Sequence, residues 1–252
     1  MDIPHSPTKY RTPDGYTADI AIFTIVPKIT KPYTPPIMDL QLLLIQRSSK
    51  NNEGLPNVEG EKWALAGGFI SEHETGEEAA LRELKEETGI SHIHLQHFMV
   101  ADKPGRDPRG WIISNVYFAI VPHYLLSQMQ AGDDAQDVKL FSVTELETLD
   151  LAFDHREIIN EAISVVKTEM LQTTLAKNFL PELFTYSELQ AVLATVTDDP
   201  AILSPQQFAR KIKQLPFIEA VEGQTSTRTS KRKTQLYRFK DIPIHYSIYK
   251  MS

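Results

Sequence analysis

The stretch G-F-I-S-E-H-E-T-G-E-E-A-A-L-R-E-L-K-E-E-T-G-I, from Gly68 to Ile90, decides the fold because it places an acidic cluster on one short helix beside a pair of glycines. The spacing predicts a helix from about Thr75 to Thr88, and Gly89 is placed to end it as the residue just past its last turn. Three glutamates stand at i, i+3 and i+4 of that helix and share a face, namely Glu83, Glu86 and Glu87.

Three carboxylates this close repel one another. A helix that faces solvent normally has lysines among its acids, whereas a site for a hard divalent cation uses carboxylate oxygens. Gly67 and Gly68 form a loop that lets the backbone turn tightly and come close to a bound group. The cluster therefore predicts a magnesium ion bridging to a pyrophosphate, with a solvated acidic helix as the alternative.

The stretch resembles the Nudix box, G-x5-E-x7-R-E-U-x-E-E-x-G-U with U apolar. Every fixed position is met, by Gly68, Glu74, Arg82, Glu83, Leu84, Glu86, Glu87, Gly89 and Ile90. The resemblance implies a magnesium-dependent site for nucleoside diphosphates linked to another group. It also implies that Arg82 orients a box glutamate, that the catalytic residues are Glu83, Glu86 and Arg82, and that the metal site comprises Gly67, Glu83, Glu86 and Glu87. Such ions neutralise phosphates and lower the pKa of an attacking water.

Length and composition leave room for a second domain. A chain of 252 residues, 41% of them hydrophobic, suits one large globular domain or two smaller ones. The absence of cysteine excludes disulfides and thiolate zinc sites. Met1–His5 shows no signal-peptide pattern and no apolar run approaches a membrane span, so we expect a cytoplasmic protein with no membrane partner.

The net charge of −7 hides an asymmetry along the chain. Residues 201–252 hold ten Lys or Arg against three acidic residues, a balance of +7. Residues 1–200 hold 16 basic and 30 acidic residues, a balance of −14. A basic segment after an acidic body indicates two domains with different partners.

The first part of the chain is predicted to be a mixture of strands and helices. The segment Pro27–Pro36, with four prolines, is predicted to be a loop. This pattern suits an α/β/α sandwich around a mixed sheet, which is the Nudix fold by resemblance, and we assign residues 1–152 to it. Strands are predicted at 16–26, 40–46, 93–100, 111–122 and 138–142.

A connecting helix is predicted within residues 153–178. Asp154 and Glu157 form an apparent capping box, and apolar residues then recur at helical spacing to about Ala176. The helix closes the core of its own domain, forms a dimer interface, or acts as a strut between domains.

Residues 179–252 are predicted to form a winged helix-turn-helix domain. One helix opens at Thr185-x-x-Glu188 and a second at Ser204-Pro205, and two strands, 217–222 and 235–239, flank a polar basic loop. The second helix would enter the major groove, and the loop would form a wing on phosphate or in the minor groove. The alternative is a small module for solubility or assembly. The expected contacts to double-stranded DNA are Gln206, Gln207, Arg210, Lys211, Arg228, Lys231 and Arg232.

A second resemblance covers most of the chain. The segments F-L-P-E-L-F-T-Y-S-E-L-Q-A-V (179–192), P-Q-Q-F-A-R-K-I (205–212) and T-Q-L-Y-R-F (234–239) are similar to the Nudix-related transcriptional regulators of NAD metabolism. G-R-D-P-R-G-W (105–111) and L-A-F-D-H (151–155) are similar to segments of the same regulators and of ADP-ribose pyrophosphatases. The resemblance implies a homodimeric repressor whose Nudix domain senses ADP-ribose.

We expect ADP-ribose to bind with its diphosphate near the acidic helix and Gly68. Arg47, Arg106 and Arg109 are candidates for phosphate or ribose contacts, because guanidinium forks suit phosphate oxygens, and surface salt bridges are the alternative. Trp111 either stacks on the adenine or belongs to the core. Bound ligand would change the placement of the two winged modules in a dimer and lower DNA affinity.

An enzymatic interpretation competes with the regulatory one. The intact box suits an active ADP-ribose pyrophosphatase that releases AMP and ribose 5-phosphate, with magnesium as cofactor. An RNA-processing Nudix hydrolase is a third interpretation, which a lack of aromatic residues among the basic ones disfavours.

Overall fold

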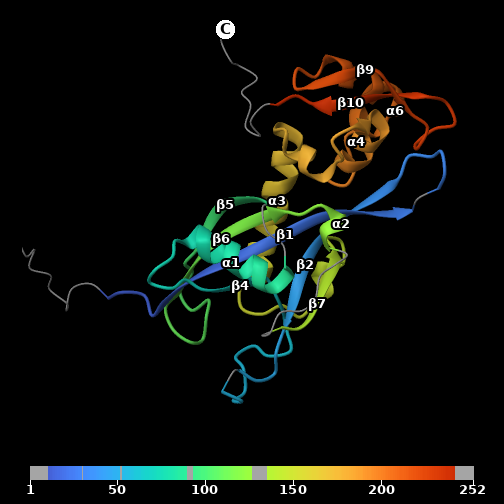
Figure 1. Ribbon diagram of the computed structural model, residues 1–252. Coiled ribbons are helices and arrows are strands. Elements are labelled where there is room, and N and C mark those ends of the chain that lie inside the picture. The colour runs from blue at the N-terminus through green and yellow to red at the C-terminus, as the bar shows by residue number, and fades with distance from the viewer. Residues whose placement is uncertain (1–10, 30, 52, 90–92, 127–134, 242–252) are drawn as a thin grey trace, which may run out of the picture.

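The computed structural model describes residues 11–29, 31–51, 53–89, 93–126 and 135–241. Ile90 of the acidic stretch and residues 242–252 of the expected second domain lie outside these ranges. The chain forms a large sheet between helices and a small sheet with short helices at one end (Figure 1). Within the described ranges, no helix has both the length and the hydropathy to cross a membrane.

The large sheet is mixed. Strand β1 pairs in parallel with β6 and antiparallel with β2 and β4, and the order along the main path is β3-β2-β1-β6-β5, with β7 on β2. Its described strands are β1 (Gly15–Ile29), β2 (Ile37–Arg47), β3 (Trp63–Ala64), β4 (Ala66–Phe69), β5 (His94–Ala101), β6 (Ile112–Ile120) and β7 (Ala135–Ser142). A short 3-10 helix, η1 (Leu146–Thr148), follows β7.

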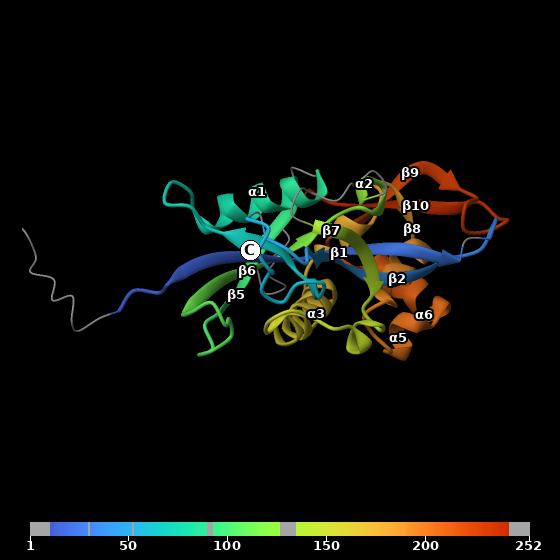
Figure 2. The same ribbon diagram turned by 90° about the horizontal axis from the view of Figure 1, so that it is seen from below.

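Alternating side chains along β1 bury apolar groups on both faces of the sheet. Ile20 and Ile22 pack with the cluster beneath α1 (Gly76–Thr88) and near α2 (His123–Leu126). Phe23 and Ile25 pack on the other face with the cluster that includes α3 (His155–Gln172). Figure 2 shows α1 and α3 on opposite sides of the sheet. The α/β/α sandwich expected from the sequence is confirmed.

Helix α3 differs from the expectation at both ends. Asp154 is its N-cap residue, but the carboxylate makes no capping hydrogen bond and instead accepts two from Arg106. The expected capping box was therefore wrong, because a buried guanidinium is a stronger partner than a backbone N–H. The helix ends at Gln172 rather than near Ala176, and a 3-10 helix, η2 (Leu175–Phe179), follows.

The C-terminal part has the elements of a winged helix. Its small sheet has the order β8-β10-β9, and the wing is the loop between β9 and β10. The two expected helices and the expected hairpin are confirmed, whereas α5 and β8 were not predicted. The elements are β8 (Phe184–Thr185), α4 (Tyr186–Leu193), α5 (Pro200–Leu203), α6 (Pro205–Lys211), η3 (Ile212–Gln214), β9 (Ile218–Ser226) and β10 (Thr234–Phe239).

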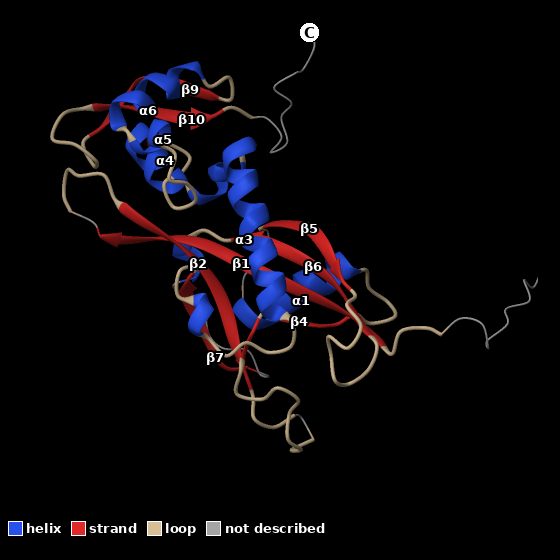
Figure 3. Ribbon diagram, turned by 180° about the vertical axis from the view of Figure 1, so that it is seen from behind, coloured by secondary structure: helices blue, strands red, loops and turns tan. Residues whose placement is uncertain are grey.

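The β1–β2 hairpin extends from the large sheet toward the winged helix. The prediction that a loop begins at Pro27 was wrong, since β1 continues to Ile29 and Pro27 pairs with Met38. The register shifts directly after Pro27, which is the kind of irregularity that accommodates a proline in a strand. The hairpin passes beside the helices of the winged domain (Figures 1 and 3), and β2 contacts α4.

One apolar cluster runs through both parts of the chain. It joins Phe23 of β1 and Val166 of α3 to Phe184 of β8 and Phe208 of α6, and each of these side chains is almost fully buried. The structure shows two of the three roles considered for the connecting helix. Helix α3 packs on the sheet of its own domain, and it also reaches the winged helix.

Candidate functional site

Helix α1 starts and ends where its sequence predicts. Thr75 and Glu78 form a reciprocal capping box, in which Glu78 Oε2 accepts from the Thr75 backbone N–H at 2.8 Å and the Glu78 N–H donates to Thr75 Oγ1 at 3.2 Å. Gly89 has a φ of 71°, and its N–H donates to the Lys85 carbonyl at 2.7 Å. Both ends are therefore fixed, and the glutamates of the helix stand at defined positions.

Arg82 binds three of the box glutamates. Its Nε and Nη2 donate to Glu74 at 3.1 and 2.8 Å, and its Nη1 donates to Glu83 at 2.7 Å and to Glu86 at 3.2 Å. Nη2 also donates to the Phe69 carbonyl at 3.2 Å, which ties α1 to the end of β4. The hydrogen bonds from Arg82 lower the pKa of Glu74 to about 2. This geometry suits an arginine that orients glutamates, the role that the box resemblance implies.

The two glycines lie in β4, against β1, and not in a loop as expected. Gly67 has a φ of 154°, and a Cβ there would strike the Ala18 carbonyl and Asp19. A Cβ on Gly68 would strike the carboxylate of Glu83. Glycine at position 68 thus allows Glu83 to lie directly against the strand. Burial raises the pKa of Glu83 above its ordinary value, so its negative charge lacks full compensation.

The box glutamates face different surroundings. Glu83 and Glu87 are largely buried and line a cavity of about 380 Å³ together with Gly67 and Gly68. The side chain of Glu86 is 60% exposed and is held by Arg82, one turn earlier. Among the described residues, no three acidic or histidine side chains converge closely enough to hold an ion. The buried oxygens of Glu83 and Glu87 at this cavity are of the kind that a hard divalent cation binds, whereas Glu86 is not among the residues that line it.

Two of the predicted arginines meet above one aromatic ring. The guanidinium carbons of Arg47 and Arg109 lie 5.0 and 5.3 Å from the centroid of the Phe153 ring. Arg109 also pairs with Asp107 at 2.6 Å, and Arg47 donates to the Val58 carbonyl at 3.2 Å. Burial, followed by the charge of Arg109, lowers the pKa of Arg47. Both arginines line the 380 Å³ cavity and a smaller adjoining one of about 70 Å³.

The other two side chains predicted to contact the ligand, those of Arg106 and Trp111, are less available at these cavities. Arg106 lines the smaller cavity, but its side chain is only 4% exposed and forms a two-pronged ion pair with Asp154 at 2.8 and 2.9 Å. Trp111 is 40% exposed and lines neither cavity, so the expectation that it belongs to the core was wrong. Its backbone N–H donates to Asp14 at 2.7 Å.

Several residues of the smaller cavity were missed by the sequence reasoning, among them Asp19, Phe153 and His155. Phe153 has a φ of 51°, and Asp19 accepts from Ser114 Oγ at 2.6 Å. His155 accepts from the Leu65 N–H through Nδ1 at 3.0 Å, and burial lowers the pKa of its imidazole. The segment L-A-F-D-H, noticed for its resemblance, contains two of them and could have indicated the site.

The predicted DNA-contacting residues are mostly exposed. Phe208 and Ile212 anchor α6 and η3 in the core. The outer face of α6 carries Gln206, Gln207, Arg210 and Lys211, and the wing tip carries Lys231 and Arg232. Arg228 differs from these, since its guanidinium is paired within the protein with Glu188.

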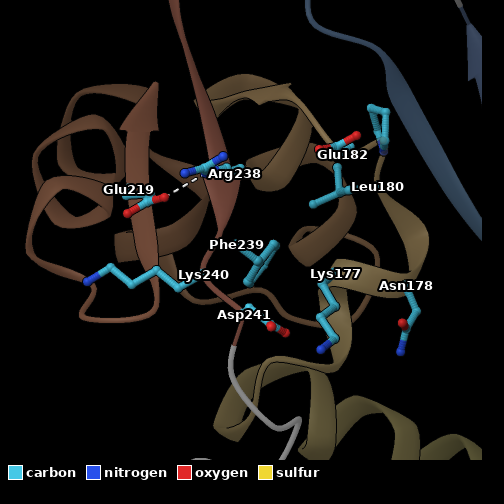
Figure 4. A pocket seen from close by; sticks show the side chains of 10 residues that line it. Lys177, Asn178, Leu180, Glu182, Glu219, Arg238, Phe239, Lys240 and Asp241 are labelled. Atoms are coloured by element: carbon cyan, nitrogen blue, oxygen red, sulfur yellow. Dashed lines mark hydrogen bonds and ion pairs between the residues drawn. The ribbon is translucent and has the colours of Figure 1, made fainter. Parts of the chain in front are cut away.

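A larger cavity, of about 710 Å³, lies between η2 and the small sheet (Figure 4). Its wall carries the basic residues Lys177, Arg238 and Lys240 and the acidic residues Glu182, Glu219 and Asp241. Arg238 and Glu219 neutralise each other at 2.6 Å. None of the predicted site residues lines this cavity, and its balanced charge gives no preference for an anion or a cation.

Comparison with known proteins matches both parts of the chain. The NUDIX domain model matches residues 36–162, and the NrtR DNA-binding winged helix domain model matches residues 176–239. The ADPR responsive transcriptional repressor NtrR of Acinetobacter baylyi is 31% identical over 226 residues, covering 88% of this chain and 81% of the relative. The chain belongs to the NrtR family of Nudix proteins.

The NrtR fold and the Nudix fold are each represented among the relatives. The crystal structure of Shewanella oneidensis NrtR complexed with a 27mer DNA has a TM-score of 0.68 and 26% identity, covering 89% of this chain and 93% of that chain. The ADP-ribose pyrophosphatase of Methanocaldococcus jannaschii is 39% identical over 123 residues, 49% of this chain and 66% of the relative. Nudix hydrolases generally use divalent metals, which agrees with the oxygen donors of Glu83 and Glu87.

Proposed function

We propose that the protein is a transcriptional repressor of NAD metabolism genes, which binds operator DNA through its winged helix and senses ADP-ribose in its Nudix domain. The observation that carries this proposal is the NrtR-family match across both domains, because a pyrophosphatase needs only the first. We place the repressor in the cytoplasm. We also expect a homodimer, since a protein with two-fold symmetry matches an operator with two-fold symmetry.

The geometry of α6 supports DNA recognition. Its apolar side is buried through Phe208, which leaves the amides of Gln206 and Gln207 and the guanidinium of Arg210 exposed. Amides pair with adenine and guanidinium with guanine in the major groove, and lysines neutralise phosphates. We expect Lys211, Lys231 and Arg232 to contribute mainly to phosphate binding.

The cavity beside α1 supports a ligand with a diphosphate. Arg47 and Arg109 bring two guanidinium groups to the lining of the cavity, and Glu83 and Glu87 bring two carboxylates. The arginines suit phosphate oxygens directly, and magnesium held by the glutamates would neutralise the remaining charge. Gly68 lets the Glu83 carboxylate lie against the strand at the wall of this cavity.

Strand β2 offers a route from the cavity to the DNA-binding domain. Arg47 at its last position lines the cavity, and the strand also contacts α4 of the winged helix. A ligand that draws Arg47 toward its phosphates would bias how the winged helix sits on the Nudix domain. In a dimer, this bias changes the spacing of the two recognition helices and lowers operator affinity.

The first test is fluorescence anisotropy of labelled duplex DNA from the region upstream of the protein's own gene, at fixed salt, with and without ADP-ribose. We expect selective binding that ADP-ribose weakens. Arg210→Gln should weaken binding by roughly tenfold, as for a lost base contact. Lys139→Gln, which removes an exposed charge on β7 of the Nudix sheet, should leave affinity unchanged. Operator affinity that saturating ADP-ribose leaves untouched would contradict the sensor function.

An active ADP-ribose pyrophosphatase is the second candidate, favoured by the intact box and by the 39% identity to the Methanocaldococcus enzyme. With magnesium bound, the site would activate a water for attack on the diphosphate. We expect AMP release with magnesium to be lost in Glu86→Gln and kept in Glu77→Gln, an exposed acid of the same helix. No AMP after hours with the wild-type protein would exclude this activity.

A further inference from the structure

The wing is held against the start of α4 by one arginine. Arg228, two residues beyond the end of β9, donates through Nε to Glu188 Oε1 at 2.6 Å and through Nη2 to Glu188 Oε2 at 2.8 Å. Nη2 also donates to the Leu183 carbonyl at 2.5 Å, just before β8. The guanidinium thus binds two elements that lie about 40 residues earlier in the chain.

The partner carboxylate is itself fixed in place. Glu188 is the third residue of α4 and forms a capping box with the N-cap residue Thr185. Its Oε2 accepts from the Thr185 N–H at 2.7 Å and from Thr185 Oγ1 at 3.0 Å. Only 13% of the Glu188 side chain is exposed. Next to Arg228, the Thr229 side chain is buried and donates to Thr185 Oγ1 at 3.2 Å. The wing is therefore fastened to a rigid helix start.

We propose that Arg228 is a positioning residue for DNA binding: it latches the wing to α4, so that the exposed Lys231, Arg232 and Lys233 face the phosphate backbone. This inference rests on the proposed DNA-binding function. It replaces the expectation that Arg228 itself contacts DNA, because its guanidinium already donates three hydrogen bonds within the protein. We call the pair of Arg228 and Glu188 the wing latch.

The two roles of Arg228 predict opposite effects of removing the charge of Glu188. If Arg228 binds phosphate, Glu188→Gln removes a negative charge near DNA and frees the guanidinium, so affinity rises. If the latch positions the wing, the same change weakens the charge-assisted pair and affinity falls. Glutamine at this position keeps the capping box, so the helix start is preserved.

The experiment measures anisotropy of the labelled upstream duplex with the full chain. We expect Glu188→Gln, Arg228→Gln and the double variant each to weaken binding by roughly three- to tenfold, the size of one partly exposed charge-assisted pair, and not additively. Arg228→Lys should not restore the wild-type affinity for DNA, because lysine keeps the positive charge but lacks the two-pronged guanidinium that pairs with Glu188. Glu222→Gln, an exposed acid on β9, is the matched control and should bind as well as wild type or slightly better.

Thermal unfolding and ADP-ribose affinity should stay close to wild type in all variants, which separates a wing effect from misfolding. Tighter binding by Glu188→Gln, or full rescue by Arg228→Lys, would overturn the latch while leaving the proposed function intact. If the wild-type protein shows no selective duplex binding, the proposed function fails and the latch falls with it.

Discussion

At Glu74 the protonation of a single carboxylate is set chiefly by one neighbour, Arg82. Arg82 donates to both of its oxygens, and together with the Ser71 N–H these bonds lower the pKa of Glu74 to about 2 from its ordinary 4.5. Because the folded-state pKa lies below the unfolded one, Glu74 stabilises the fold above pH 4.5. This contribution is lost as the pH falls from about 4.5 to about 2.

We therefore expect Glu74→Gln to be less stable than wild type at pH 7 and to lose less stability on acidification through this window. Urea denaturation at several pH values measures the difference. Glu72→Gln, whose side chain is 84% exposed, makes the same charge change without Arg82 and should follow the wild-type curve. Parallel curves for Glu74→Gln and wild type would contradict this assignment.

At the scale of elements, two ion pairs join the loop after β5 to the start of α3. Arg106 and Asp154 form the buried pair, and Lys103 and Glu157 form an exposed pair at 2.7 Å. We expect Arg106→Ala to lower the free energy of unfolding by about 3 kcal/mol or more, since it leaves a buried carboxylate without its partner. Lys103→Ala should cost less than about 1 kcal/mol, as surface pairs do.

Denaturant titration of the two variants measures both free energies, and equal losses would contradict the burial argument. The comparison is matched because both pairs connect the same loop to the same helix. The variant Arg106→Ala should also loosen the wall of the smaller cavity, in which Arg106 lies.

Local patterns explain which elements were predictable. The start of α4 was predicted from Thr185 and Glu188, because a capping box is a contact between residues three apart. The same pattern failed at Asp154, because Arg106 lies 48 residues away and sequence spacing does not show that pairing. Phe153 and Asp19 were missed in the site for the same reason, since only the fold brings them together. The box motif identified the glutamates, but it does not show that Glu83 and Glu87 line the cavity while the side chain of Glu86 is 60% exposed.

At the scale of the whole molecule, the two domains share one core. Val166 of α3 is fully buried in the cluster that also contains Phe184 and Phe208 of the winged helix. We expect the chain to unfold in one calorimetric transition, and Val166→Ala to lower the melting temperature of that single transition by roughly 2–6 °C, as about 1–2 kcal/mol does in a chain of this size. Val100→Ala, at a 44% exposed position on β5, should leave it unchanged. Two separate transitions would show that the domains fold independently.

The shared core limits how such a chain can be recombined. The two family models match separate parts of the chain, residues 36–162 and 176–239, as though the two parts were interchangeable domains. A winged helix grafted onto a foreign Nudix domain would leave Phe184 and its apolar neighbours without the α3 side chains that belong to the same cluster. A working chimera between relatives must therefore take α3 and the winged helix from the same parent protein. Its junction must lie before residue 155, where α3 begins.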